Sequence, residues 1–244
     1  MLNTLKRWAA IAAEVRRLPR VEVDLQCAGT AGNDPFYERI VRDFYREARQ
    51  RHRKFPLVRQ YEYGFCLCAL PRNFDDYFRL IEGAARRNYK KSLRLGYQFA
   101  RLDYNAHVDE IAEIIGSTDA RQGRPMPAHL LSRARGGIDD PPSRSDRHDY
   151  PYYGIFREGR LYAYASCLIA GELCAIQTIF GHADYQDDGI VPMLIISLAE
   201  CAIRDYPHVR YYAYGSYYGA SVTMQRFKRK FGFMPHVASW NLGA

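Results

Sequence analysis

Three consecutive apolar segments, joined by very short turns, constrain the fold more than any other part of the sequence. They cover Tyr152–Arg157, Arg160–Ala170 and Leu173–Gly181, and aromatic and aliphatic side chains dominate them. Glu158-Gly159 and Gly171 stand at the connections, which are long enough only for hairpins. The pattern predicts an antiparallel meander of three strands.

Regular elements on both sides of the meander complete an α+β pattern. From Tyr97 onward we expect a strand, two helices, the three strands, a helix, a strand, a helix and a last strand. The expected bounds outside the meander are Tyr97–Asp103, His107–Ser117, Pro127–Arg135, Ile190–Tyr206, Val209–Tyr214, Ser221–Lys230 and Phe231–Asn241. Between the helices and the meander, residues 136–150 form an irregular segment, interpreted as either a functional lid or a disordered surface loop.

The region before Tyr97 predicts further elements. Arg20–Cys27 alternates apolar and polar residues, which is typical of a half-buried strand. Asp34 followed by Pro35 predicts a helix start, with the helix ending near Gln50. Val58–Leu70 is predicted to be a strand or hairpin, and Asn73 to cap the next helix.

Positive charge is concentrated in the first part of the chain. The net charge is +8, yet residues 1–101 alone have ten more basic than acidic side chains. The densest run is Arg86–Arg94, and on a helix the fourfold spacing places Arg86, Arg87, Lys90 and Lys91 on one side. This surface is interpreted either as a solvated face or as a site for a polyanion: tRNA, another nucleic acid, a nucleotide-containing cofactor or an anionic membrane.

Cysteine and histidine usage argues against a disulfide framework and a metal site. The six cysteines include no Cys-x-x-Cys pair, and the seven histidines include no His-x-x-x-His pair. Most of the cysteines lie in apolar runs, where cysteine behaves as a small hydrophobic residue. No apolar run approaches the ~20 residues of a membrane-spanning helix. We therefore expect a cytoplasmic protein without a metal ion or transmembrane segment.

Three passages resemble Fem-like transferases of the GNAT superfamily. Leu70–Tyr77 followed by Arg86–Gly96 is similar to their Leu-Pro, aromatic-acidic and basic-helix passage. Thr118-Asp-Ala-Arg121 resembles their Thr-x-x-Arg, and Met224–Pro235 is similar to their Phe-Lys-x-x-Phe-Gly element. The resemblance implies a GNAT-like α+β fold, with a central mixed, mostly antiparallel sheet flanked by helices.

The resemblance also implies a domain division. Residues 86–244 are expected to form the GNAT-like acyltransferase domain, and residues 1–85 a short basic α/β extension or partial GNAT-like half. Fem-like enzymes of cell-wall synthesis usually have two full GNAT-type domains, and the first 85 residues are too short for one. The acceptor is therefore left open as a small-molecule or peptide amine, and the oligomeric state is left open.

For function, the resemblance implies transfer of an aminoacyl group from aminoacyl-tRNA to an amine, with no separate cofactor. A GNAT acyltransferase that uses acyl-CoA or another acyl thioester is an alternative, and a non-catalytic nucleic-acid-binding protein is another. Acetyl-CoA-dependent relatives have an Arg/Gln-x-x-Gly-x-Gly/Ala loop whose amides bind the diphosphate. The matching segment here, Tyr185–Pro192, has one glycine, two aspartates and a proline, which disfavours that cofactor.

The resemblance places Phe227 and Lys228 at the acyl-transfer centre. Lys228 has a second interpretation, as one of several cations that complement a helix C-terminus. Tyr212 and Tyr214, on one face of a strand, are candidates for proton relay or for stacking on an adenine, or else they pack in the sheet.

Two further sets of candidates come from polar segments. Asp187 and Asp188 are candidates for binding the acceptor amine or acting as a base, or else they belong to a polar loop. Arg121 is a candidate for phosphate or carboxylate recognition, or else it makes a structural ion pair.

Overall fold

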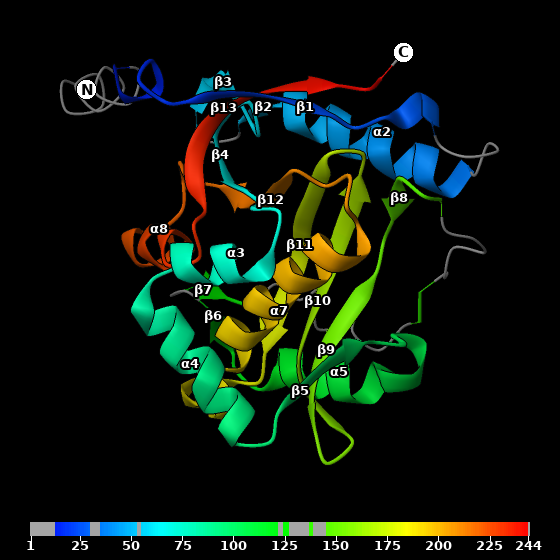
Figure 1. The fold of residues 1–244 in the computed structure, drawn as a ribbon, viewed down its shortest axis with the longest axis vertical. Coiled ribbons are helices and arrows are strands. Elements are labelled where there is room, and N and C mark those ends of the chain that lie inside the picture. The colour runs from blue at the N-terminus through cyan, green and yellow to red at the C-terminus, as the bar shows by residue number, and fades with distance from the viewer. Residues whose placement is uncertain are drawn as a thin grey trace.

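The chain folds around one mixed sheet with helices on both faces (Figure 1). The computed structural model describes residues 13–29, 35–52, 55–121, 124–126, 137–138 and 145–243. Within them the sheet has nine strands in the order β1-β13-β4-β12-β11-β10-β9-β5, with β8 paired to β10. The strands are β1 (Arg20–Asp24), β4 (Tyr63–Ala69), β5 (Gln98–Arg101), β8 (His148–Asp149), β9 (Tyr152–Arg157), β10 (Arg160–Ala170), β11 (Leu173–Gly181), β12 (Tyr211–Ser216) and β13 (Met234–Asn241).

Helices of the described residues cover the sheet in two layers. Alternate residues of β10 show the two faces: Ala165 and Cys167 pack with α7, while Tyr164 packs in the cluster that contains α5. The helices α3 and α4 lie over α7, and α2 packs on the same face as α5. The bounds are α2 (Pro35–Arg49), α3 (Phe74–Leu80), α4 (Gly83–Arg94), α5 (Val108–Gly116), α7 (Ile190–Asp205) and α8 (Val222–Arg229).

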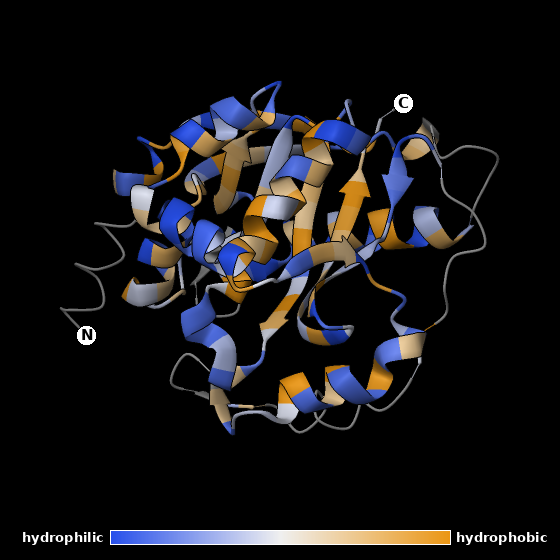
Figure 2. Cartoon of the chain, turned by 60° about the horizontal axis from the view of Figure 1, so that its bottom comes forward, coloured by the Kyte–Doolittle hydropathy of each residue, from blue (hydrophilic) through white to orange (hydrophobic). Residues whose placement is uncertain are grey.

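The helix α7 lies at the centre of the larger apolar cluster. Figure 2 shows the apolar colours concentrated on the central strands, while the surrounding helices are largely polar on their outer sides. Nearly every residue from Met193 to Ala202 is buried, as expected for a helix enclosed between a sheet and other helices. No helix in the described part of the chain is both long and apolar enough to cross a bilayer.

The predicted meander is confirmed. β9, β10 and β11 have the expected bounds and are antiparallel neighbours. β1 and β4 come from the first 85 residues, and β4 lies between β13 and β12 in the same sheet. Residues on both sides of the expected boundary at 85 therefore build one sheet.

Several expected bounds were wrong. The first strand ends at Asp24, and Cys27–Gly29 is a short 3₁₀ helix. The last strand starts at Met234, because Gly232 turns the chain with φ +82°. The polar segment before α7 is mostly a 3₁₀ helix, η4 (Ala183–Asp188). The helix expected over Pro127–Arg135 lies outside the described residues, as do residues 136 and 139–144 of the irregular segment, whose described end includes β8.

The parallel neighbours β11 and β12 pair over only three positions. Leu173, Cys174 and Ala175 match Tyr211, Tyr212 and Ala213. Beyond them β12 bends away, and its last residue pairs with Phe65 of β4. At the same level β11 has a bulge in its pairing with β10, since Cys167 matches Ile176 while Ser166 matches Thr178. Gln177 is the extra residue, and it is exposed. The two strands therefore separate next to an irregularity that loosens β11.

A buried carboxylate ties the end of α7 to the sheet. Asp149 has a side-chain exposure of 1%, and its oxygens accept hydrogen bonds from Arg101 (3.4 Å) and from the hydroxyl of Tyr206 (2.6 Å). The backbone amide of Tyr150 also donates to it, at 2.8 Å. Both β5 and the end of α7 thus depend on one carboxylate of β8.

We predict that Asp149→Asn lowers the free energy of unfolding by about 1–3 kcal/mol, because an amide NH₂ would face a donor that now meets an acceptor. Urea denaturation measures this change. The matched control is Asp184→Asn, whose side chain is 80% exposed, and it should change stability by less than about 0.5 kcal/mol. Equal effects of the two substitutions would contradict the structural role of Asp149.

Candidate functional site

Lys228 lies where β12 bends away from β11. Its helix, α8, begins at Ser221, whose hydroxyl accepts a hydrogen bond from the Met224 amide at 3.2 Å. Lys228 is only 5% exposed. Its Nζ donates to the carbonyl oxygen of Ser216 at 2.8 Å and lies 4.9 Å from the ring centroid of Tyr214. Two contacts therefore hold the ammonium at the point of strand separation.

Burial changes the protonation of this group. Desolvation lowers the pKa of Lys228, and the nearby Cys66 opposes that shift. Burial raises the pKa of the Cys66 thiol to about 11, with Lys228 and Arg229 acting in the opposite direction. Burial also raises the pKa of Tyr214 to about 12. Lys228 thus faces a thiol and a phenol whose raised pKa values keep them neutral near pH 7, and it has no carboxylate within 4.0 Å among the described residues.

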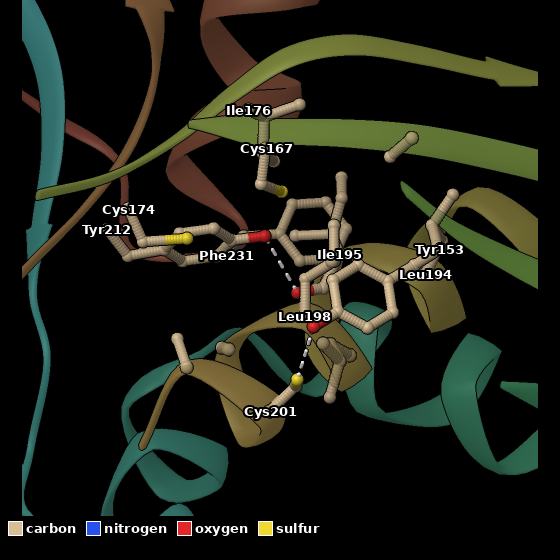
Figure 3. Packing of buried hydrophobic residues seen from close by; sticks show 14 of the residues in the cluster. Tyr153, Cys167, Cys174, Ile176, Leu194, Ile195, Leu198, Cys201, Tyr212 and Phe231 are labelled. Atoms are coloured by element: carbon tan, nitrogen blue, oxygen red, sulfur yellow. Dashed lines mark hydrogen bonds between the residues drawn. The ribbon is translucent and has the colours of Figure 1, made fainter. Parts of the chain in front are cut away.

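Tyr212 and Tyr214 lie on the same face, as predicted, but in different surroundings. Both rings contact Phe233, with centroids at 4.9 and 5.9 Å. Tyr212 is fully buried, and its hydroxyl donates to the carbonyl oxygen of Ile195 at 3.0 Å (Figure 3). This placement fits the packing interpretation for Tyr212. Tyr214 is half-buried and beside Lys228, where a ligand-facing role is available to it.

Phe227 points into the apolar cluster. It is half-buried, and its ring lies 5.0 Å from that of Phe231. Adjacent residues of α8 thus anchor the helix in the core and bring the ammonium of Lys228 to the strand junction.

The structure brings Lys91 and the two aspartates together, although the sequence analysis assigned them to separate sites. The Nζ of Lys91 donates to the carbonyl oxygen of Asp187 at 2.6 Å and lies 4.0 Å from the carboxylate of Asp188. The hydroxyl of Tyr97 donates to the same carboxylate at 2.7 Å, and Ser92 donates to the Asp188 carbonyl at 2.6 Å. Asp188 is therefore held by the fold, while the side chain of Asp187 is exposed.

The helix α4 packs directly on the start of α7. Gly189 caps α7 with φ +81°, and a Cβ built there would lie 2.7 Å from the carbonyl oxygen of Asn88 in α4. Such a separation leaves no room for a side chain or a ligand between Gly189 and Asn88. Glycine at this position thus serves both the left-handed backbone and the close approach of the two helices.

Internal hydrogen bonds occupy much of the backbone before α7. The amide of Ala183 donates to the Ser117 hydroxyl at 2.9 Å, and that of Asp184 to Nδ1 of His182 at 3.3 Å. The Tyr185 amide donates to the carbonyl oxygen of His182 at 3.3 Å, and the Gly189 amide to that of Gln186 at 3.1 Å. These four donors are not directed at an anionic ligand.

The four cations of the expected basic surface on α4 divide into two pairs. Lys91 is engaged with the aspartates, and Nη1 of Arg86 donates to the carbonyl oxygens of Phe78 and Arg79 at the end of α3, at 3.3 Å each. Arg87 and Lys90 are exposed. The side chain of Arg121 lies outside the described residues, and its backbone belongs to the small strand β6 (Ala120–Arg121), which pairs with β7 (Arg124–Pro125).

Comparison with solved structures identifies the fold. FemX matches with a TM-score of 0.56 and 11% sequence identity, over 73% of this chain and 60% of FemX. The chain has a GNAT-like fold of the Fem type. The α+β class expected from the sequence is thereby confirmed. The chain spans 60% of the length of FemX.

Other solved structures match more loosely. The C-terminal domain of a putative lysylphosphatidylglycerol synthetase from Agrobacterium fabrum has a TM-score of 0.45 and 14% identity, over 71% of this chain and 58% of that one. A GCN5-related N-acetyltransferase from Kribbella flavida has a TM-score of 0.38 and 16% identity, over 57% and 47%. No protein-family model and no curated protein matches the chain.

Sequence reasoning missed two groups of the site. The contact of Asn88 with Gly189 joins residues far apart in the chain and has no local signal. The carbonyl of Ser216 is a backbone group and carries no signal of its own. The sequence analysis noted the single glycine before α7, Gly189. It did not predict that this glycine packs against the basic helix α4.

Gly189→Ala should destabilise the protein more than Gly96→Ala. Both glycines have positive φ, at +81° and +82°, so both substitutions cost about 1 kcal/mol of backbone strain. A Cβ at Gly96 meets nothing within 4 Å, whereas one at Gly189 meets the backbone of α4. We expect an additional loss of about 1–3 kcal/mol for Gly189→Ala in chemical denaturation. Indistinguishable losses would show that α4 is not seated on α7 in solution.

Proposed function

We propose that this protein is an acyltransferase that moves an aminoacyl group from aminoacyl-tRNA to the amine of a small molecule or peptide. The Fem-like passages in the sequence and the fold likeness to FemX support this reaction class. The packing of α4 on the start of α7 is the observation that carries the choice of donor.

The contact of α4 with the start of α7 disfavours an acyl-CoA donor. A diphosphate at this place needs unpaired backbone amides and a favourable potential. Here four amides before α7 already donate within the chain, and Asn88 closes on Gly189. Asp187 and Asp188 add negative charge beside that position. An aminoacyl ester on RNA has no diphosphate to place there, so this packing does not obstruct it.

Lys228 is proposed to stabilise the oxyanion of the tetrahedral intermediate. In the reaction the acceptor nitrogen attacks the ester carbonyl carbon, the bond from that carbon to the ribose oxygen breaks, and the amine proton is transferred to the leaving oxygen. A lysine ammonium has three donors. The bond to Ser216 uses one of them and fixes the position of the group. Positive charge placed in advance where negative charge develops lowers the barrier.

The other candidates have more limited roles in the proposal. Tyr214 is available to relay a proton or to stack on the terminal adenine, and Phe227 anchors α8. Asp187 has an exposed carboxylate that can bind the acceptor amine as a cation. Asp188 positions the loop through Tyr97 and Lys91. Arg87 and Lys90 are the cations of the α4 surface proposed to meet tRNA.

A donor assay tests the proposal. Purified protein is incubated with labelled aminoacyl-tRNAs and, separately, with acyl-CoAs, each with a panel of amines. We expect enzyme-dependent transfer of label from tRNA to an amine, with no release of free CoA thiol. Thiol release without loss of label from tRNA would assign an acyl-CoA donor. Salt-sensitive RNA binding without either reaction would assign a non-catalytic RNA-binding protein.

The pH dependence of transfer tests Lys228. Burial lowers the pKa of Lys228, so the ammonium is lost as pH rises through a value below the ordinary 10.5. The single-turnover rate, corrected for spontaneous ester hydrolysis, should fall with that same midpoint. Lys228→Met should lower the rate about 10²-fold at neutral pH while leaving RNA affinity nearly unchanged.

Two variants provide the controls for this profile. Lys228→Arg keeps its charge throughout the range and should abolish the alkaline fall, whatever its absolute rate. Lys230→Gln, at the half-exposed end of α8, should keep the shape of the wild-type profile when the rate is measured at saturating RNA. An alkaline fall that persists unchanged in Lys228→Arg would exclude the ammonium as its source.

A further inference from the structure

Two arginine-rich helices of this protein differ in whether their charges are neutralised. In α2, Arg42 pairs with Glu38 at 2.8 Å and Arg46 pairs with Asp43. Of the other two arginines of α2, Arg49 lies 3.7 Å from Glu62, while the exposed Arg39 lies over the ring of Phe36. Three of the four arginines of α2 therefore have a carboxylate within 4.0 Å, which reduces the net field of that surface.

The cations on the outer side of α4 have no such partners. Arg87, Lys90 and Arg94 are exposed, and no carboxylate among the described residues lies within 4.0 Å of them. The helix carries no acidic residue in its first turn. Positive charge on this face is therefore uncompensated, in contrast to α2.

The end of α8 extends this charged face. The amide of Glu82, at the start of α4, donates to the carbonyl oxygen of Lys230 at 2.9 Å. The hydroxyl of Tyr77 in α3 donates to the Phe231 carbonyl at 3.3 Å. Figure 1 shows α8, α3 and α4 along the same side of the molecule. The two basic helices are thus joined by direct backbone contact.

Two cations of α8 face outward beside this junction. Arg226 is exposed and Lys230 is half-exposed, and like the α4 cations they have no carboxylate within 4.0 Å among the described residues. Their fourfold spacing places them on one side of the helix. Lys228 is two residues from each, about 200° around the helix axis, and it is buried. The same helix therefore presents cations outward and one ammonium inward.

We propose that α4 and α8 form one surface for the phosphodiester backbone of the duplex part of the donor RNA. This α4–α8 surface consists of Arg87, Lys90, Arg94, Arg226 and Lys230, and it rests on the function proposed above. A rigid duplex stays on the outer side of α8, so only a single-stranded 3′ end reaches Lys228 on its inner side. The fitting donor is an RNA with a duplex stem followed by an unpaired, acylated 3′ tail.

The apolar residues next to this surface allow an experiment to distinguish an RNA partner from a membrane. Leu93 and Leu95, at the end of α4, are 47% and 40% exposed. An anionic bilayer would use these leucines together with the cations. Phosphate contacts of RNA need only the cations, so the leucines provide a diagnostic substitution.

The experiment measures RNA affinity as a function of salt. The probe is a short RNA hairpin with a single-stranded 3′ tail, followed by fluorescence anisotropy. Arg226→Gln/Lys230→Gln and Arg87→Gln/Lys90→Gln should each weaken binding and lower the salt slope by about 1–2. The control, Arg42→Gln/Arg46→Gln, removes the same formal charge from α2 and should leave the slope unchanged. Thermal melting verifies that each variant is folded.

A transfer assay with an aminoacylated RNA minihelix distinguishes failure of this inference from failure of the proposed function. The double variant Arg226→Gln/Lys230→Gln should transfer more slowly than wild type at subsaturating RNA, and its rate should reach the wild-type rate at saturating RNA. If the α8 pair behaves like the α2 control while the α4 pair loses binding, the surface does not include α8 and the donor assignment stands. Absence of both RNA binding and transfer in the wild type would overturn both proposals.

A membrane partner has its own outcome. Wild-type protein is sedimented with vesicles of phosphatidylcholine and phosphatidylglycerol, alongside Leu93→Ser/Leu95→Ser. We expect the serine variant to retain full RNA affinity. Vesicle binding that the serine substitutions abolish, together with absent RNA binding, would reassign the surface to an anionic bilayer.

Discussion

The short pairing between β11 and β12 determines the geometry of the whole site. Three matched positions hold the two halves of the sheet together, and then β12 turns toward β4. A fully paired strand would direct its backbone groups into the ladder. Because β12 leaves early, the Ser216 carbonyl is available for Lys228, and Tyr214 lies beside the ammonium instead of in the core. The departure of one strand thus creates a polar position at the centre of an apolar sheet.

The helix α4 connects this site with the charged exterior. Its inner side holds the start of α7 through Asn88, Ser92 and Lys91, and its outer side carries Arg87 and Lys90. In a CoA-dependent GNAT domain the start of the corresponding helix must remain open to an anion. Here α4 covers that start, and α7 gains a packing partner along its first turn. The donor proposed above and the stability of α7 thus rest on the same contact.

Local sequence patterns predicted the elements that depend on neighbouring residues. The meander follows from three apolar runs with very short turns, and the GNAT-like class followed from the order of elements together with three passages that resemble Fem-like transferases. Long-range pairing was beyond such patterns: nothing in Tyr63–Ala69 indicates insertion between β13 and β12. Alternation correctly placed Tyr212 and Tyr214 on one face of β12. Their burial differs because the strand bends after Ala213, so Tyr214 lies beyond the regular part of the sheet. Likewise, Asp188 and Asp187 are adjacent and chemically identical, yet only Asp188 meets Tyr97.

The cations at the end of α8 differ in their surroundings. Arg229 contacts the ring of Tyr217, and Lys230 lies at the helix end, where positive charge complements the dipole. Lys228 is different because its ammonium is withdrawn from water, at a cost that a solvated position would avoid. One carbonyl bond and one ring contact offset part of that cost. A helix-end cation gains nothing from burial, so burial of this one lysine among exposed neighbours favours a role for its charge at the strand junction.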